Sequence, residues 1–153
     1  MTTATAPLTG IFPIAPVAFH DDGTLDQEGC KRILECMIDQ GVDGICILAN
    51  YSEQFLLDDG ERDSILTLSM EAVGGRVPVI VTCSHFATRI AAERAKRARE
   101  VGAEMVMLMP PYHGALLKAG EEGIVEHFKA VADAAQVAIM VQDAPLSGVN
   151  LSV

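Results

Sequence analysis

The sequence predicts an α/β fold with a parallel sheet, and three observations support this prediction. Short apolar runs alternate along the chain with segments of helical periodicity. The apolar runs are continuous, as in strands that are buried on both faces of a parallel sheet. Two segments also share one pattern, in which a glycine, a small apolar residue and an acidic residue precede a strand: GVDGICIL at residues 41–48 and GAEMVMLM at residues 102–109. A βα unit takes about 30 residues, so two units separate the two segments.

The first third of the chain predicts an irregular strand, a helix and a buried strand. Two prolines interrupt the apolar run at residues 11–19, which is therefore at best a short, irregular strand. A helix is expected from an N-cap at Asp26 to about residue 40, with Gly41 ending it. Its buried stripe is expected to comprise Ile33, Leu34, Met37 and Ile38. Residues 45–48 are too few for a helix and are expected to form the second strand.

The remainder continues the alternation of helices and strands. The expected helices cover about residues 57–73, 87–101 and 121–134, and the expected strands cover residues 78–82, 105–109 and 138–141. The inner face of the first of these helices is expected to carry Ile65, Leu68, Met70 and Ala72. The charges of the next helix predict a solvated face with i,i+4 pairs. No element is assignable to residues 146–153, and no change of composition divides the chain.

Composition limits the classes of function. The 153 residues suffice for one domain. A net charge of −10, from 21 acidic and 11 basic residues, argues against nucleic acid or an anionic membrane as a partner. The start of the chain predicts no signal peptide, and no apolar run approaches the ~20 residues that span a bilayer. The cysteines lie in no CxxC pair, so we expect small buried residues in a reducing cytoplasm rather than disulfides or a metal site.

Polar side chains follow the second expected strand directly. Asn50, Tyr51, Ser52 and Glu53 stand at its carboxyl end, where parallel α/β proteins bind ligands. The alternative is an ordinary polar turn that leads into the next helix, with Ser52 or Asp58 as the helix cap. The pattern therefore predicts a binding site but leaves a structural turn open.

Length alone does not choose between two parallel architectures. A (β/α)8 barrel needs at least ~200 residues, and the sequence stops after a fifth expected strand. A five-stranded doubly wound sheet fits the length better. It is disfavoured because the first strand is followed by no glycine-rich phosphate loop and the fifth by no helix. We therefore expect a chain that is interrupted within its fold.

Six segments of the chain, one of them helical, resemble the N-acetylneuraminate lyase and dihydrodipicolinate synthase family. The matching segments are GIFP at residues 10–13, DDGTLD at 21–26, the turn at 49–53, PY at 111–112, EHFKAVA at 126–132 and DAP at 143–145. The resemblance implies a TIM (β/α)8 barrel, of which residues 1–153 cover roughly the first five βα units as the N-terminal part of a single domain. It also implies a homo-oligomer, most often a tetramer. Such proteins act on small 2-keto acids through a lysine Schiff base, without a cofactor or metal.

The departures from the family pattern indicate a particular branch. Where the family has Gly-Thr-Thr-Gly-Glu or Gly-Ser-Thr-Gly-Glu, this chain has ANYSE at residues 49–53. His113 replaces the second tyrosine of Pro-Tyr-Tyr, and Gln142 replaces the proton-shuttling tyrosine of Tyr-Asn-x-Pro. The arginine that follows this proline in the synthases is also missing. These changes disfavour a lysine-pathway synthase or a sialic acid lyase, and the turn resembles that of the sugar-acid dehydratases.

The resemblance implies an elimination on a 2-keto-3-deoxypentonate that gives 2-oxoglutarate semialdehyde and water. A lysine attacks the C2 ketone, the iminium acidifies C3, and the enamine expels the C4 hydroxyl. The expected substrate-binding residues are Asn50, Tyr51, Ser52 and Tyr112. The expected catalytic residues are His113 and Gln142, which position the leaving hydroxyl. His113 is the better acid because the unperturbed pKa of histidine lies near 6.5.

The expected Schiff-base lysine lies on a sixth strand, beyond Val153. Three of the four lysines present, Lys31, Lys96 and Lys129, fall on expected helices, and Lys118 falls in a loop. Residues 1–153 alone are therefore expected to be inactive.

Several alternatives remain open at this stage. An aldolase of the same family passes through the same enamine, and a non-catalytic half-barrel could dimerise to cover its strand edges. Tyr51 could cover the core and His113 could be solvated, while His20, His85 and His127 are expected to be surface or capping residues.

Overall fold

The computed structural model describes residues 8–113, 117–144 and 151, and its elements alternate as expected. The helices are α1 (Gln27–Asp39), the 3₁₀ helix η1 (Asn50–Ser52), α2 (Asp59–Val73), α3 (Thr88–Glu100) and α4 (Glu121–Ala135). The strands are β1 (Ile45–Ile47), β2 (Val79–Thr82), β3 (Met105–Leu108), β4 (Tyr112–His113), β5 (Leu117–Lys118) and β6 (Ala138–Val141). All the expected helices are confirmed. The expectation for residues 146–153 lies outside the described residues, apart from residue 151.

The main sheet is parallel, and its strands lie in chain order, β1-β2-β3-β6. Its register pairs Cys46 with Ile80 and Val106 with Ile139. The first expected strand is reduced to one parallel bridge, Ile14 to Cys46, beside β1. The prolines of that segment account for this, because proline cannot donate to a strand ladder.

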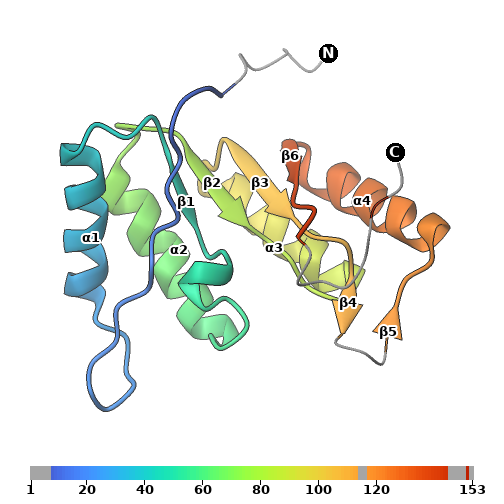
Figure 1. The fold of residues 1–153 in the computed structure, drawn as a ribbon, viewed down its shortest axis with the longest axis horizontal. Coiled ribbons are helices and arrows are strands. Elements are labelled where there is room, and N and C mark those ends of the chain that lie inside the picture. Colours follow the sequence, from blue (N-terminus) through green and yellow to red (C-terminus); the bar gives the residue numbers. More distant parts are fainter. Residues whose placement is uncertain (1–7, 114–116, 145–150, 152–153) are drawn as a thin grey trace.

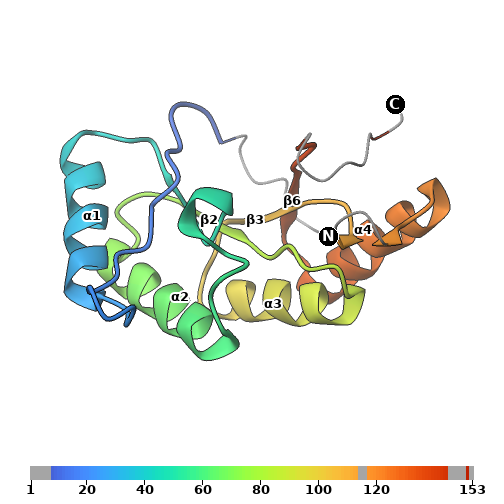
Figure 2. The ribbon, with the colours of Figure 1, turned by 60° about the horizontal axis from the view of Figure 1, so that its bottom comes forward.

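The four α-helices lie in an arc on one side of the main sheet (Figures 1 and 2). A doubly wound sheet has helices on both faces and reverses its strand order at a switch point. Chain-order parallel strands with helices outside are instead the arrangement of a (β/α)8 barrel. The doubly wound alternative is therefore wrong, and the described residues form part of a barrel wall.

Alternate residues of each strand pack on opposite faces of the sheet, as the pleat requires. The face toward the helices carries the larger buried cluster, with Ile45, Ile47, Val79, Val81, Val106 and Leu108 among its strand residues. The opposite face carries Cys46, Ala49, Ile80 and Met107, with Phe12 and Ile14 packed against them. A Cβ atom on Gly44 would lie 2.0 Å from the Phe12 ring, so only glycine lets the N-terminal segment approach β1.

The expected helix boundaries have the expected chemistry. The Asp26 carboxylate accepts a hydrogen bond from the Gly29 amide at 2.8 Å, and Gly41 after α1 has a φ of +76°. Asp58 and Glu61 form a reciprocal capping box at the start of α2. Asp58 rather than Ser52 is thus the cap of that helix.

The inner face of α2 differs in part from the prediction. Ile65 and Leu68 are buried, but Met70 and Ala72 are only partly buried. The rest of the stripe comprises Arg62, Leu66, Ser69 and Val73. The expected face therefore omitted a buried arginine and a buried serine, because polar residues were assigned to the solvent.

Three further details correct the sequence analysis. Cys36 is exposed, whereas the other three cysteines are buried. The charges of α3 do not all pair within that helix. Arg94 and Arg97 form ion pairs with Asp59 and Asp63 of α2, at 3.0 and 2.8 Å. Strands β4 and β5 form an antiparallel pair that the sequence did not predict. In the described part of the chain, no helix has the length and apolar character needed to cross a bilayer.

Candidate active site

The turn after β1 is a single turn of 3₁₀ helix held by one buried hydroxyl. Ser52 is fully buried, and its Oγ donates to the Ala15 carbonyl at 2.6 Å. The same oxygen accepts from the Ala49 amide at 3.1 Å. Ser52 therefore joins the turn to the N-terminal segment and has no exposed atom for a substrate. We assign it a structural role in place of the expected binding role.

Asn50 lies at the open end of β1 and is half-buried. Its side-chain oxygen accepts a hydrogen bond from Nε2 of Gln54 at 2.7 Å. Its Nδ2 lies 3.9 Å from the sulfur of Met109, the residue that follows β3. The Asn50 amide thus extends over the carboxyl ends of the strands, where the sequence placed the binding site.

The ends of the other strands are joined by hydrogen bonds across the sheet edge. The Met109 amide donates to Oγ of Ser84 at 2.9 Å, and the Gln142 amide donates to the Leu108 carbonyl at 2.9 Å. Ser84 is buried and was missed by the sequence analysis. The available signal was its position, since it follows the apolar run of β2 just as Asn50 follows that of β1.

A buried arginine supports the same edge from the helical side. Arg62 of α2 donates to the Thr82 carbonyl at 3.0 Å and to the Gln54 carbonyl at 3.5 Å. Burial, aided by the charge of Arg94, lowers the pKa of Arg62 to about 10, so the guanidinium stays protonated at neutral pH. Arg94 donates in turn to the Ser84 carbonyl at 3.2 Å. Two positive charges therefore lie beneath the ends of β1 and β2.

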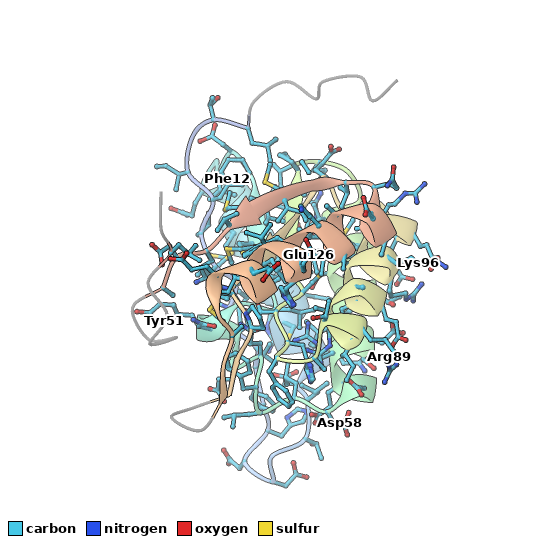
Figure 3. All side chains as sticks on the ribbon, turned by 90° about the vertical axis from the view of Figure 1, so that its right-hand side faces the viewer. Phe12, Tyr51, Asp58, Arg89, Lys96 and Glu126 are labelled. Carbon is cyan, nitrogen blue, oxygen red and sulfur yellow. The ribbon has the colours of Figure 1, made fainter. Side chains whose placement is uncertain are left out.

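The structure describes the other predicted site residues in unequal detail. Tyr51 is 80% exposed and lies on the opposite side of the molecule from Arg89 and Lys96 of α3 (Figure 3). Tyr112 and His113 form β4, and the positions of their side chains lie outside what the structure describes. Gln142 is half-buried beyond β6, and its Oε1 is enclosed without a hydrogen-bond partner among the described residues. The structure brings Asn50 to the strand ends, where its side chain is within hydrogen-bonding reach of Gln54 and Met109 among the described residues.

Two of the histidines expected at the surface or at caps have distinct roles. His85 is half-buried and stacks on Phe86, and its Nδ1 accepts from the amide of Ala87, the N-cap residue of α3, at 2.9 Å. Since α3 has no side-chain cap, His85 is neither a surface residue nor a helix cap. His127 is buried in α4 rather than at the surface, and its Nδ1 lies 2.9 Å from Oγ1 of Thr88. Burial lowers the pKa of both rings.

The lysines of the helices face solvent, as expected. Lys31, Lys96 and Lys129 are exposed and pair with glutamates of their own helices. No lysine side chain that the structure describes lies at the strand ends. Within those same residues, no three His, Cys, Asp or Glu side chains gather as metal ligands would.

Chain-order parallel strands, an outer layer of helices and polar groups at the carboxyl strand ends define a barrel protein with a ligand site at the mouth of the barrel. Comparison with known proteins identifies the family. A model of the dihydrodipicolinate synthetase family matches residues 7–153. The chain therefore belongs to this family, and its fold is that of a TIM barrel.

Individual relatives agree with this assignment. L-2-keto-3-deoxyarabonate dehydratase of Azospirillum brasilense is 52% identical over 153 residues, which are 99% of this chain and 50% of that protein. The 4-hydroxy-tetrahydrodipicolinate synthase of Methylacidiphilum fumariolicum SolV superposes with a TM-score of 0.89 at 26% identity, over 95% of this chain and 48% of the other. YagE, a prophage protein of the family from E. coli K12 solved in complex with pyruvate, superposes with a TM-score of 0.81 at 29% identity. The match covers 89% of this chain and 45% of YagE. The chain thus spans about half the length of these relatives.

Proposed function

We propose that the protein to which this chain belongs is a Schiff-base dehydratase that converts 2-keto-3-deoxy-L-arabonate to 2-oxoglutarate semialdehyde and water. The observation that carries the proposal is the 52% identity to a dehydratase of that name over nearly the whole chain. The altered strand ends support it, because Asn50, His113 and Gln142 stand where the synthases carry a threonine and two tyrosines. We propose that residues 1–153 are the N-terminal part of one barrel domain.

In the proposed reaction, a lysine beyond Val153 attacks the C2 ketone and water leaves, which gives an iminium. The iminium withdraws electrons from C3, so a proton leaves C3 and an enamine forms. The enamine electrons then break the C4–O bond, and the hydroxyl departs with a proton as water. Tautomerisation and hydrolysis release the semialdehyde and restore the lysine.

The described residues supply binding and orientation for these steps. We assign carboxylate or hydroxyl binding to Asn50, Tyr51 and Tyr112, and positioning of the leaving hydroxyl to His113 and Gln142. Oε1 of Gln142 is an acceptor without a partner among the described residues, and a substrate hydroxyl would reach it only once the atoms that enclose it move. Arg62, beneath the strand ends, supplies local positive charge that favours an anionic substrate although the chain as a whole is acidic, whereas the charge of Arg94 is paired with Asp59.

We also propose that the protein is a cytoplasmic homo-oligomer, with a tetramer as the expected form. Its support is that several large apolar side chains in the segments that follow β1 and β2 are exposed. These are Tyr51, Phe55, Leu56 and Phe86. Such side chains are common where subunits meet.

The activity is tested by incubating the complete gene product with 2-keto-3-deoxy-L-arabonate and measuring the semialdehyde. We expect turnover by the complete protein and none by residues 1–153 alone. Release of pyruvate without semialdehyde would support the aldolase instead. Turnover by residues 1–153 would contradict the placement of the lysine.

A further inference from the structure

Gln54 is a buried amide directly behind the candidate site. It follows η1 by two residues, and only 2% of its surface is exposed. Its backbone is held on both sides, because its amide donates to the Ala49 carbonyl at 3.4 Å and its carbonyl accepts from Arg62 at 3.5 Å. Of its two polar side-chain atoms, Nε2 forms a hydrogen bond to Asn50, whereas Oε1 is buried without a partner among the described residues.

The Gln54 side chain fixes which end of the Asn50 amide faces the site. Nε2 of Gln54 donates to Oδ1 of Asn50 at 2.7 Å, which holds the oxygen end of that amide toward Gln54. Nδ2 of Asn50 is thereby directed toward the end of β3, where the Met109 sulfur at 3.9 Å is only a weak acceptor. The half-buried amide thus presents a hydrogen-bond donor to the strand ends.

We propose that Gln54 is a positioning residue that holds Asn50 as a donor, so that Asn50 binds a carboxylate oxygen of the 2-keto acid. This inference rests on the proposed function and adds a residue to which neither the family motif nor the sequence pattern assigned a role. An amide can present either its oxygen or its nitrogen. Without Gln54, both orientations of Asn50 are available, and the orientation with the oxygen outward repels a carboxylate.

The test is the substitution Gln54→Glu, because a carboxyl group at this position reverses the hydrogen bond when it ionises. While neutral, the introduced carboxyl group donates its O–H to Oδ1 of Asn50, as the amide of Gln54 does. Once ionised, it only accepts, so it attracts Nδ2 and turns Oδ1 toward the substrate. Gln54→Met removes the donor at every pH, and Gln27→Glu is the matched control, because Gln27 is exposed at the start of α1.

Pyruvate is titrated into each variant of the complete protein, and the adduct is trapped with borohydride. The measured quantity is the pyruvate concentration that gives half of the maximal adduct. It is divided by the wild-type value at the same pH, for each pH from 5 to 8.5. For Gln54→Glu, we expect a ratio near one at low pH that rises about tenfold to a hundredfold as the carboxyl ionises, with an unchanged maximal adduct. For Gln54→Met we expect an elevated, pH-independent ratio, and for Gln27→Glu a ratio of one throughout.

A pH-independent ratio for Gln54→Glu that equals the ratio for Gln54→Met would overturn the inference and leave Gln54 as a space-filling residue. If Gln54→Met does not fold, the pH dependence of Gln54→Glu is compared with that of Gln54→Glu combined with Asn50→Ala. A dependence that persists without Asn50 comes from repulsion between the two carboxylates and overturns the positioning role. Absence of any adduct in the wild type is a different result. It would overturn the proposed function, and this inference with it, since Asn50 would have no keto acid to bind.

Discussion

Replacing Arg62 with alanine is expected to lower the free energy of unfolding by about 3–5 kcal/mol. The side chain is buried between α2 and the end of β2, and it donates to the carbonyls of Thr82 and Gln54. The substitution leaves a cavity and removes a donor from two carbonyls beside the candidate site. A loss of this size is a large part of the stability of an ordinary domain.

Urea unfolding of the purified protein measures this loss, with Arg99→Ala as the control. Arg99 lies exposed in the last turn of α3, so its replacement is expected to change stability by no more than about 0.5 kcal/mol. If Arg62→Ala cost less than about 1 kcal/mol, its hydrogen bonds would contribute little, and the strand ends would be held by the apolar core alone.

Replacing Ser52 with alanine is expected to cost about 2–4 kcal/mol, because two buried backbone groups would lose their partner. These groups are the Ala15 carbonyl and the Ala49 amide, which one hydroxyl joins. Little volume changes between serine and alanine, so the loss comes from unsatisfied polar groups rather than from a cavity. Ser52 itself does not contact the substrate. Pyruvate binding should therefore weaken only through a change in the conformation of the turn that carries Asn50.

Ser64→Ala is the matched control for this substitution. Ser64 is exposed in α2, where its hydroxyl donates to the Gly60 carbonyl of the same helix. Alanine is the better helix former, so the control should be neutral or slightly stabilising. Thermal unfolding of both variants tests the assignment. Equal melting temperatures for the two would contradict the structural role of Ser52.

The order of elements could be predicted from the sequence because local signals determine it. Asp26, Gly41 and Asp58 mark helix ends by their own chemistry, and the continuous apolar runs mark buried strands. The choice between barrel and doubly wound sheet could not be made this way. It depends on which side of the sheet each helix packs, and the spacing of apolar residues within a helix does not encode that.

The location of the candidate site, at the carboxyl ends of the strands, could be predicted from the sequence. The residues that form it could be predicted only in part. Asn50 was found because a polar residue directly follows a buried strand. Ser52 was misassigned because its partner, Ala15, lies 37 residues away and no local pattern reveals that contact. Gln54 and Arg62 were missed for a related reason, since buried polar side chains look like surface residues in a sequence. The β4–β5 pair was missed because residues 110–114, with two prolines and a glycine, indicate a turn, and the two strands are too short to show an alternating pattern.

Borohydride trapping of the complete gene product with pyruvate, followed by intact mass and peptide mapping, tests the central claim most directly. The family assignment predicts a mass gain on one lysine beyond Val153, since Lys31, Lys96 and Lys129 lie exposed on the outer helices. An adduct on Lys31, Lys96, Lys118 or Lys129 would contradict the placement of the nucleophile. No adduct on any lysine would contradict the Schiff-base function itself, and the half-barrel interaction module would become the better explanation of the fold.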